Sequence, residues 1–130
     1  MSSFVTRSER YLLSIHNTIS SKVKSFKRLF IQKGLLLRTF DYITWLYEKE
    51  DFNGIELVIM QLHSQVPVHW SPRYYKYYEL IDYCVFLISY NRNLTAIEGL
   101  TAATDLIATL NLGHELGRRI EKKVLDILRN

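Results

Sequence analysis

The sequence predicts an all-α protein, a compact single-domain bundle of five to six helices. Apolar residues recur every three or four positions over most of the chain, whereas the sustained apolar–polar alternation of strands is missing from it. Only two prolines and five glycines occur, so long loops are not expected. A chain of 130 residues favours one domain spanning residues 1–130 with a hydrophobic core of useful size.

The first expected helix covers residues 9–33, as one helix or as two with a break near Ser20, and Gly34 ends it. Its apolar face steps through Leu12, Ile15, Ile19, Val23, Phe26 and Phe30. From Arg10 to Arg38 there are seven cations and no carboxylate, so the rest of this +4 chain carries a net charge of about −3. These cations are Arg10, Lys22, Lys24, Lys27, Arg28, Lys33 and Arg38.

The second and third helices follow with a short turn between them. The second covers residues 35–49, and its expected inward face consists of Leu36, Phe40, Ile43, Leu46 and Tyr47. The third covers residues 54–65, with Asn53 as the expected N-cap and Glu56 as its reciprocal partner in an approximate capping box.

The fourth helix, near residues 72–91, is expected to be the buried centre of the bundle. Pro67 breaks the preceding segment, and Ser71 followed by Pro72 is typical of a helix start with a serine N-cap. The last two turns are apolar on nearly every side, which indicates burial all round. Helical spacing places two adjacent faces toward the core and points Tyr75, Glu79 and Asp82 elsewhere. The residues of the first face are Tyr74, Tyr78, Ile81, Val85 and Ile88, and those of the second are Tyr77, Leu80, Cys84 and Leu87.

The last two helices begin at Thr95 and at His114. Thr95 and Glu98 have the spacing of a capping box, and the helix that follows is expected to bury one stripe: Ile97, Leu100, Ala103, Ile107 and Leu110. The final helix is expected to bury Leu116, Ile120, Val124, Ile127 and Leu128 and to expose Arg118, Arg119, Lys122 and Lys123.

The stretch SPRYYKYYELIDYCVFLISY, residues 71–90, carries six tyrosines and allows three interpretations. Its tyrosines are core residues, or a platform on which single-stranded bases stack, or part of a protein interface. Core packing is the most frequent fate of aromatic residues at helical spacing. The residues expected at a protein interface are Trp70, Arg73, Tyr74, Tyr75 and Tyr77.

The one-sided charge of the first helix predicts an anionic partner, because like charges repel one another along a helix. A non-enzymatic regulatory protein that contacts nucleic acid or a nucleoprotein complex is the favoured function. The expected nucleic-acid contacts are Lys22, Lys24, Lys27, Arg28, Lys33 and Arg38. A membrane surface is disfavoured, since the apolar face of this helix is needed by the core.

The alternative function is a protein–protein adaptor or inhibitor, such as a viral or phage accessory factor, that uses the Tyr/Trp-rich surface and binds an acidic protein or a second copy of itself as a homodimer. Residues 106–128 also have the helix–turn–basic helix order of a helix-turn-helix, although two amphipathic helices joined by a turn occur in any bundle. The run VLDIL, Val124–Leu128, resembles the C-terminal helices of the small all-helical NusB antitermination family; the likeness is limited to this tail, and no function is transferred from it.

Several kinds of chemistry have no motif in this sequence. The four histidines are scattered, and Cys84, the single cysteine, lies in the most apolar run, so neither a metal site nor a cofactor is expected. Glycine-rich phosphate loops and nucleophile elbows are missing, which argues against an enzyme. One cysteine, no secretory signal and no apolar run of membrane-spanning length favour an intracellular protein of the cytoplasm, nucleoid or nucleus.

Overall fold

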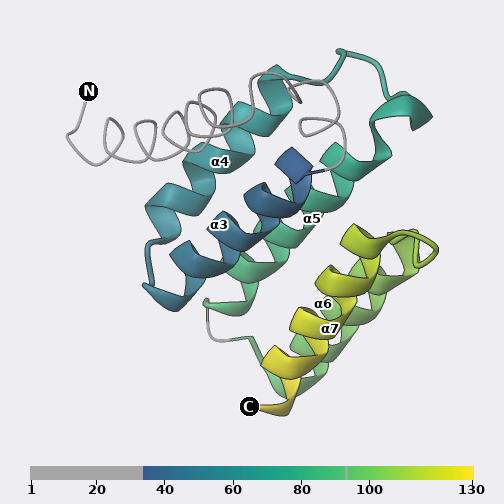
Figure 1. Cartoon of the computed structure of the whole chain (residues 1–130). Helices are drawn as coiled ribbons and strands as arrows, with labels where there is room; N and C mark the ends of the chain where they lie inside the picture. The colour runs from purple at the N-terminus through teal and green to yellow at the C-terminus, as the bar shows by residue number, and fades with distance from the viewer. Residues whose placement is uncertain (1–33, 93) are drawn as a thin grey trace. The chain divides into compact units, whose positions relative to one another are not determined.

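The computed structural model describes residues 34–92 and 94–130. Over these residues the protein is all-α, with five α-helices, one short 3₁₀-helix and no strand (Figure 1), which confirms the predicted fold class. The expected basic helix at residues 9–33 lies outside the described residues. Contacts along the chain define two compact units, Met1–Gln61 and Leu62–Asn130, which are described separately. The single domain expected from the length of the chain stays a prediction.

The described part of the first unit is a helical hairpin formed by α3 (Leu36–Glu48) and most of α4 (Phe52–Ser64). Phe40, Ile43 and Leu46 are buried on α3, as their spacing predicts. The reversal after α3 is a Schellman motif, in which the Glu50 N–H donates to Tyr47 O and the Asp51 N–H donates to Leu46 O. Glu50 therefore adopts a left-handed backbone conformation, with φ 58°, at a position where glycine is usual.

The N-terminal cap of α4 differs from the prediction. Asn53 lies inside the helix and is exposed, and the Gly54 N–H donates instead to Asp51 Oδ1 at 2.9 Å. Asp51 takes the N-cap role because the Schellman turn places it at the helix start, one residue before the first helical position. The expected Asn53–Glu56 capping box is therefore wrong, although the helix it was meant to start is present.

The described second unit contains the 3₁₀-helix η3 (Pro72–Tyr74) and the helices α5 (Tyr75–Tyr90), α6 (Ala96–Thr109) and α7 (Glu115–Arg129). α5 packs against both α6 and α7, and Leu80, Tyr83, Cys84 and Leu87 are fully buried on it. A helix near residues 72–91 is therefore present with one buried face, but the expected burial all round its last two turns is wrong, since Val85 is 47% exposed and Ile88 is half-buried. Pro72 opens η3 as predicted, but the Ser71 side chain makes no capping hydrogen bond, so the expected serine N-cap is wrong. The Ser71 backbone N–H donates to the Tyr78 hydroxyl.

The start of α6 is as predicted, whereas its buried face is not. Thr95 and Glu98 form the full capping box. Ile97 and Leu100, expected in the core, are 79% and 59% exposed. Ala103 is buried as expected, Ile107 and Leu110 are half-buried, and the remaining buried positions are Gly99 and Leu106.

Small side chains explain the shift of this face. A Cβ at Gly99 would lie 3.1 Å from the ring of Tyr90, so glycine lets α6 lie close to α5 along this stripe. The buried face is therefore rotated from the expected stripe toward Gly99, and Ala103 belongs to both.

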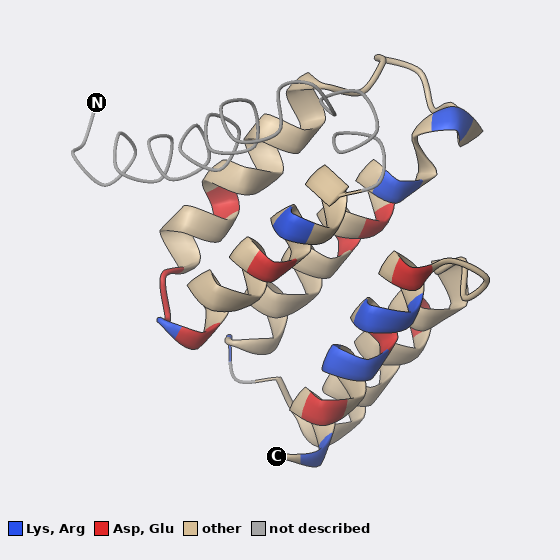
Figure 2. Ribbon diagram, in the orientation of Figure 1, with Lys and Arg blue, Asp and Glu red and all other residues tan. Residues whose placement is uncertain are grey.

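The final helix matches its prediction closely. Leu116, Ile120, Val124 and Ile127 are buried on α7, whereas Leu128, also expected inside, is half-buried. Arg118, Arg119 and Lys122 are exposed and Lys123 is half-buried; Figure 2 marks the cations along this helix. The helix begins tightly against the preceding turn, because a Cβ at Gly117 would overlap the backbone carbonyl of Asn111. The α6–α7 connection is therefore a close-packed turn.

Candidate protein-interaction surface

Trp70 stands at the start of the segment that leads into α5 and is the most exposed aromatic residue of this region, at 71%. Its indole ring stacks on Tyr78, with ring centroids 6.0 Å apart and an interplanar angle of 18°. The Tyr78 hydroxyl accepts a hydrogen bond of 3.1 Å from the Ser71 N–H, the residue next to Trp70. The stack and the hydrogen bond together orient one face of the indole toward solvent.

The neighbouring aromatic residues form two further pairs. Tyr74 and Tyr77 have ring centroids 5.8 Å apart, and Tyr75 lies 5.5 Å from the imidazole of His114. Lys76 Nζ lies 5.9 Å from the centre of the Tyr75 ring, at the outer limit of a cation–π contact. We call this set the aromatic cluster: Trp70, Tyr74, Tyr75, Tyr77, Tyr78 and His114.

The aromatic cluster contains four of the five residues expected at an interface. Trp70 and Arg73 are exposed, while Tyr74, Tyr75 and Tyr77 are half-buried. Tyr78, expected in the core, is half-buried and supports Trp70, and His114 joins the cluster from the start of α7. Sequence spacing could not reveal either pairing, because Trp70 lies in a non-helical segment and His114 is distant in the chain.

Beneath the cluster, Glu79 is only 3% exposed, although helical spacing had pointed it away from the core. Its Oε2 accepts a hydrogen bond of 2.6 Å from the Asn111 N–H, and its buried Oε1 has no hydrogen-bond partner within the described structure. Burial raises the pKa of Glu79, while the Asn111 N–H and the charge of Lys76 oppose that rise. Burial also raises the pKa of Tyr75, and the negative charge of Glu79 adds to it.

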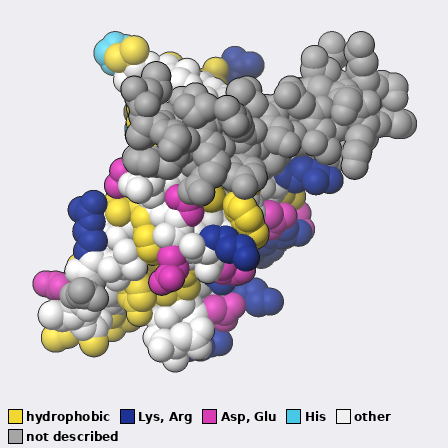
Figure 3. Space-filling view, turned by 90° about the vertical axis from the view of Figure 1, so that its left-hand side faces the viewer, with side chains coloured by type: hydrophobic (Ala, Val, Ile, Leu, Met, Phe, Trp, Pro, Cys, Tyr) yellow, Lys and Arg dark blue, Asp and Glu magenta, His cyan; other side chains and the backbone are white. Residues whose placement is uncertain are grey.

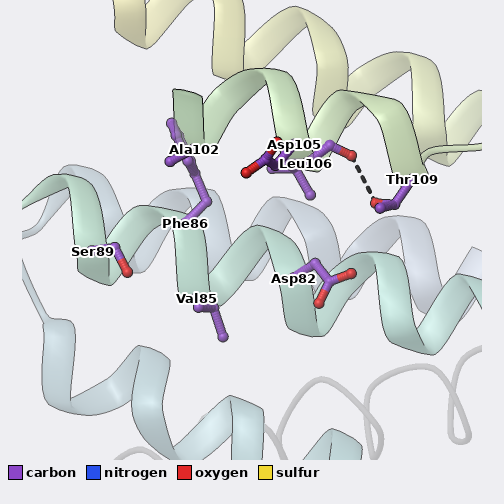
Figure 4. Close-up of a pocket in the computed structure, with 8 residues that line it drawn as sticks. All are labelled: Asp82, Val85, Phe86, Ser89, Ala102, Asp105, Leu106 and Thr109. Atoms are coloured by element: carbon purple, nitrogen blue, oxygen red, sulfur yellow. Dashed lines mark hydrogen bonds between the residues drawn. The ribbon is translucent and has the colours of Figure 1, made fainter. Parts of the chain in front are cut away.

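A groove lies between α5 and α6, C-terminal on α5 to the aromatic cluster; Figure 4 shows the residues that line it. Tyr75, Tyr78 and Asp82 are spaced by three and four residues, so they lie on one side of the helix. The α5–α6 groove has a volume of about 270 Å³. Its lining residues are Asp82, Val85, Phe86 and Ser89 of α5 and Ala102, Asp105, Leu106 and Thr109 of α6.

The groove has an apolar floor and a carboxylate on each helix. Phe86 and Leu106 are buried at its base, and Phe86 extends from α5 toward Ala102 of α6 (Figure 4). Val85, expected in the core, is 47% exposed because it lines this groove. Asp82 and Asp105 are exposed residues. Partial burial of the Asp82 carboxyl raises its pKa, and the charge of His63 opposes that rise.

Most of the residues expected to contact nucleic acid cannot be placed. Lys22, Lys24, Lys27, Arg28 and Lys33 lie outside the described residues, and Arg38 is exposed on α3. Among the described residues on the face shown in Figure 3, acidic, basic and hydrophobic side chains are interspersed. The basic nucleic-acid surface therefore stays a prediction from sequence.

Reactive and metal-binding groups are sparse in the part of the chain that the structure describes. No three or more histidine, cysteine, aspartate or glutamate residues gather there as metal ligands would. Cys84 is fully buried, and that burial raises the pKa of its thiol far above the ordinary value, which disfavours the reactive thiolate. None of the described helices has the length and hydropathy to cross a membrane.

Comparison with known proteins adds no relative to this description. No protein-family model, no curated protein and no solved structure matches the chain.

Proposed function

We propose that this protein is a non-catalytic adaptor or inhibitor that binds another protein through its aromatic cluster. The observation that carries the proposal is Trp70, which is 71% exposed and yet stacked on Tyr78. Tryptophan, tyrosine and arginine dominate the binding energy of protein interfaces, and Arg73 lies three residues from Trp70.

Pre-orientation is what makes Trp70 a good anchor. A partner that buries a freely rotating side chain must offset the lost rotamer entropy, which costs about 0.5–1.5 kcal/mol for each immobilised side chain. The stack on Tyr78 and the Ser71–Tyr78 hydrogen bond have already restricted Trp70 in the free protein. The tyrosines that follow in the chain supply apolar ring surface together with hydroxyls that can bond a partner at the rim.

The test is affinity capture from native extract with nuclease added, comparing the wild type with Trp70→Ala. We expect proteins that stay bound to the wild type after nuclease and are depleted from the Trp70→Ala capture. Met60→Ala is the matched control, because Met60 is an exposed apolar residue on α4, outside the cluster. Capture that is lost entirely with nuclease, or that is equal for wild type and Trp70→Ala, refutes the proposal.

A second candidate function, contact with nucleic acid or a nucleoprotein complex, is supported by the charge of the N-terminal segment. Seven cations and no carboxylate between Arg10 and Arg38 would attract phosphate, and affinity should then fall steeply with salt. The test is binding to mixed oligonucleotides at low and moderate salt, with Lys24, Lys27 and Arg28 changed to Glu. Binding that is unaffected by these changes, or no binding by the wild type, removes this candidate.

A further inference from the structure

The α5–α6 groove is a small surface site whose dimensions suit side chains of a partner. Ligand sites usually have volumes of about 300–1,000 Å³, and this groove has about 270 Å³. Asp82 and Ser89 bound it along α5, two helical turns apart, which corresponds to about 10 Å. One or two side chains from a neighbouring helix fit these dimensions.

The residues that line the groove indicate which partner side chains it would bind. Phe86, Leu106 and Ala102 present apolar surface at the base, which favours an aliphatic or aromatic side chain. Asp82 and Asp105 stand on opposite helices, and neither has a lysine or arginine partner in the described part of the chain. A cation placed beside the apolar side chain would therefore meet an unneutralised carboxylate on either wall.

We propose that the α5–α6 groove binds a cationic amphipathic helix of a partner protein, with apolar side chains on the Phe86–Leu106 floor and lysine or arginine paired with Asp82 and Asp105. This is the helix-in-groove mode of recognition, which reads anchors one helical turn apart. The inference rests on the proposed function, since it names the kind of partner segment that a protein-binding adaptor would hold. The groove begins one turn after Tyr78, so the same partner can reach Trp70.

The test uses the full-length chain and a fluorescently labelled synthetic amphipathic helix with leucines on one face and lysines on the other. A second peptide has the same leucines with glutamates in place of the lysines. Fluorescence anisotropy should show that the lysine peptide binds and the glutamate peptide does not. The double variant Asp82→Asn/Asp105→Asn should weaken binding about tenfold, because two ion pairs are lost.

A separate variant tests the floor of the groove. Ala102→Leu places bulk where the apolar side chain of the peptide would sit, and it should also weaken binding about tenfold. The matched control is Glu56→Gln/Glu121→Gln, which makes the same change in net charge outside the groove lining and should leave affinity within about twofold. Circular dichroism melts verify that each variant is folded before its affinity is compared.

Several outcomes would overturn the inference. Equal binding of both peptides, or equal weakening by the groove and control variants, would mean that the attraction is unspecific. A wild-type dimer in sedimentation that Asp82→Asn/Asp105→Asn abolishes would make a second copy the occupant. If the lysine peptide does not bind but Trp70→Ala still loses captured proteins, the groove proposal is refuted and the proposed function stands. If the lysine peptide binds but Trp70→Ala captures the same proteins as the wild type, the proposed function alone is refuted.

Discussion

The buried carboxylate of Glu79 accepts a hydrogen bond of 2.6 Å from the backbone N–H of Asn111, 32 residues further along the chain. This bond joins the first half of α5 to the turn between α6 and α7. The same turn ends at His114, which packs against Tyr75 in the aromatic cluster. Glu79 therefore helps to hold the interaction surface in place without being exposed on it.

Removing this carboxylate should destabilise the protein. Glu79→Ala leaves the Asn111 N–H without its acceptor and opens space beside α5, so we expect the free energy of unfolding to fall by about 1–3 kcal/mol. Urea denaturation followed by circular dichroism measures the change. Glu56→Ala, an exposed glutamate on α4, is the control and should change stability by no more than about 0.5 kcal/mol. Equal effects of the two variants would contradict this role.

Glu79 should also make stability depend on pH. Burial raises its pKa in the folded protein above the ordinary value of 4.5, so the unfolded chain loses this proton first as pH rises. The contribution of Glu79 to stability is therefore full below pH 4.5 and decreases until the pH exceeds the raised folded pKa. Glu79→Gln removes that contribution.

Urea denaturation of the wild type and Glu79→Gln at a series of pH values from about 4 upward checks the sign. We expect the stability of the wild type relative to the variant to decrease as pH rises. Asp82, whose pKa is also raised, should leave some residual pH dependence in the variant. A wild-type advantage that grows with pH would show that Glu79 is stabilised as a carboxylate instead.

The tight start of α7 should not tolerate a methyl group at Gly117. A Cβ there would overlap the backbone of Asn111, which cannot move aside as a side chain could. Alanine is the better helix former by about 1 kcal/mol, but overpacking costs about 1–3 kcal/mol, so Gly117→Ala should lower the melting temperature. Gly113→Ala is the control, because its Cβ would meet only the Asn111 side chain, at 3.2 Å. A higher melting temperature for Gly117→Ala would mean that the turn is looser than described.

The α3–α4 turn offers a stabilising substitution. Glu50 holds φ 58° at the left-handed position of the Schellman motif, where a side chain costs about 1 kcal/mol relative to glycine. Glu50→Gly should therefore raise the free energy of unfolding by up to about 1 kcal/mol, measured by urea denaturation. Lys49→Gly, one residue earlier at φ −85°, should not be stabilising. Destabilisation by Glu50→Gly would argue against the left-handed conformation.

The sequence predicted the described helices well because local signals determine where they start and stop. Thr95 and Glu98 form the capping box that their spacing indicates, and Pro72 opens the segment leading into α5. Asn53 is not the N-cap because the preceding turn places Asp51 at that position, where its carboxylate accepts the Gly54 N–H. Competing caps cannot be ranked without the geometry of the turn before them.

The faces of the helices were harder to predict than their bounds. Ile97 and Leu100 are more hydrophobic than Gly99, yet Gly99 is buried since it lets α5 approach. Glu79 is buried because Asn111, far along the chain, supplies a hydrogen-bond donor. Trp70 and Tyr78 were both visible in the sequence, but only their stacking in three dimensions indicates an oriented anchor.

The most direct test of the proposed function is a binding titration with one purified protein that the chain captures in the presence of nuclease. Isothermal titration calorimetry would give the dissociation constant for the wild type, Trp70→Ala and the control Met60→Ala. We predict that Trp70→Ala weakens binding by about thirtyfold or more, since truncating a hot-spot residue costs about 2 kcal/mol or more, while Met60→Ala matches the wild type. Equal affinities for wild type and Trp70→Ala would contradict the assignment of the aromatic cluster as the binding surface.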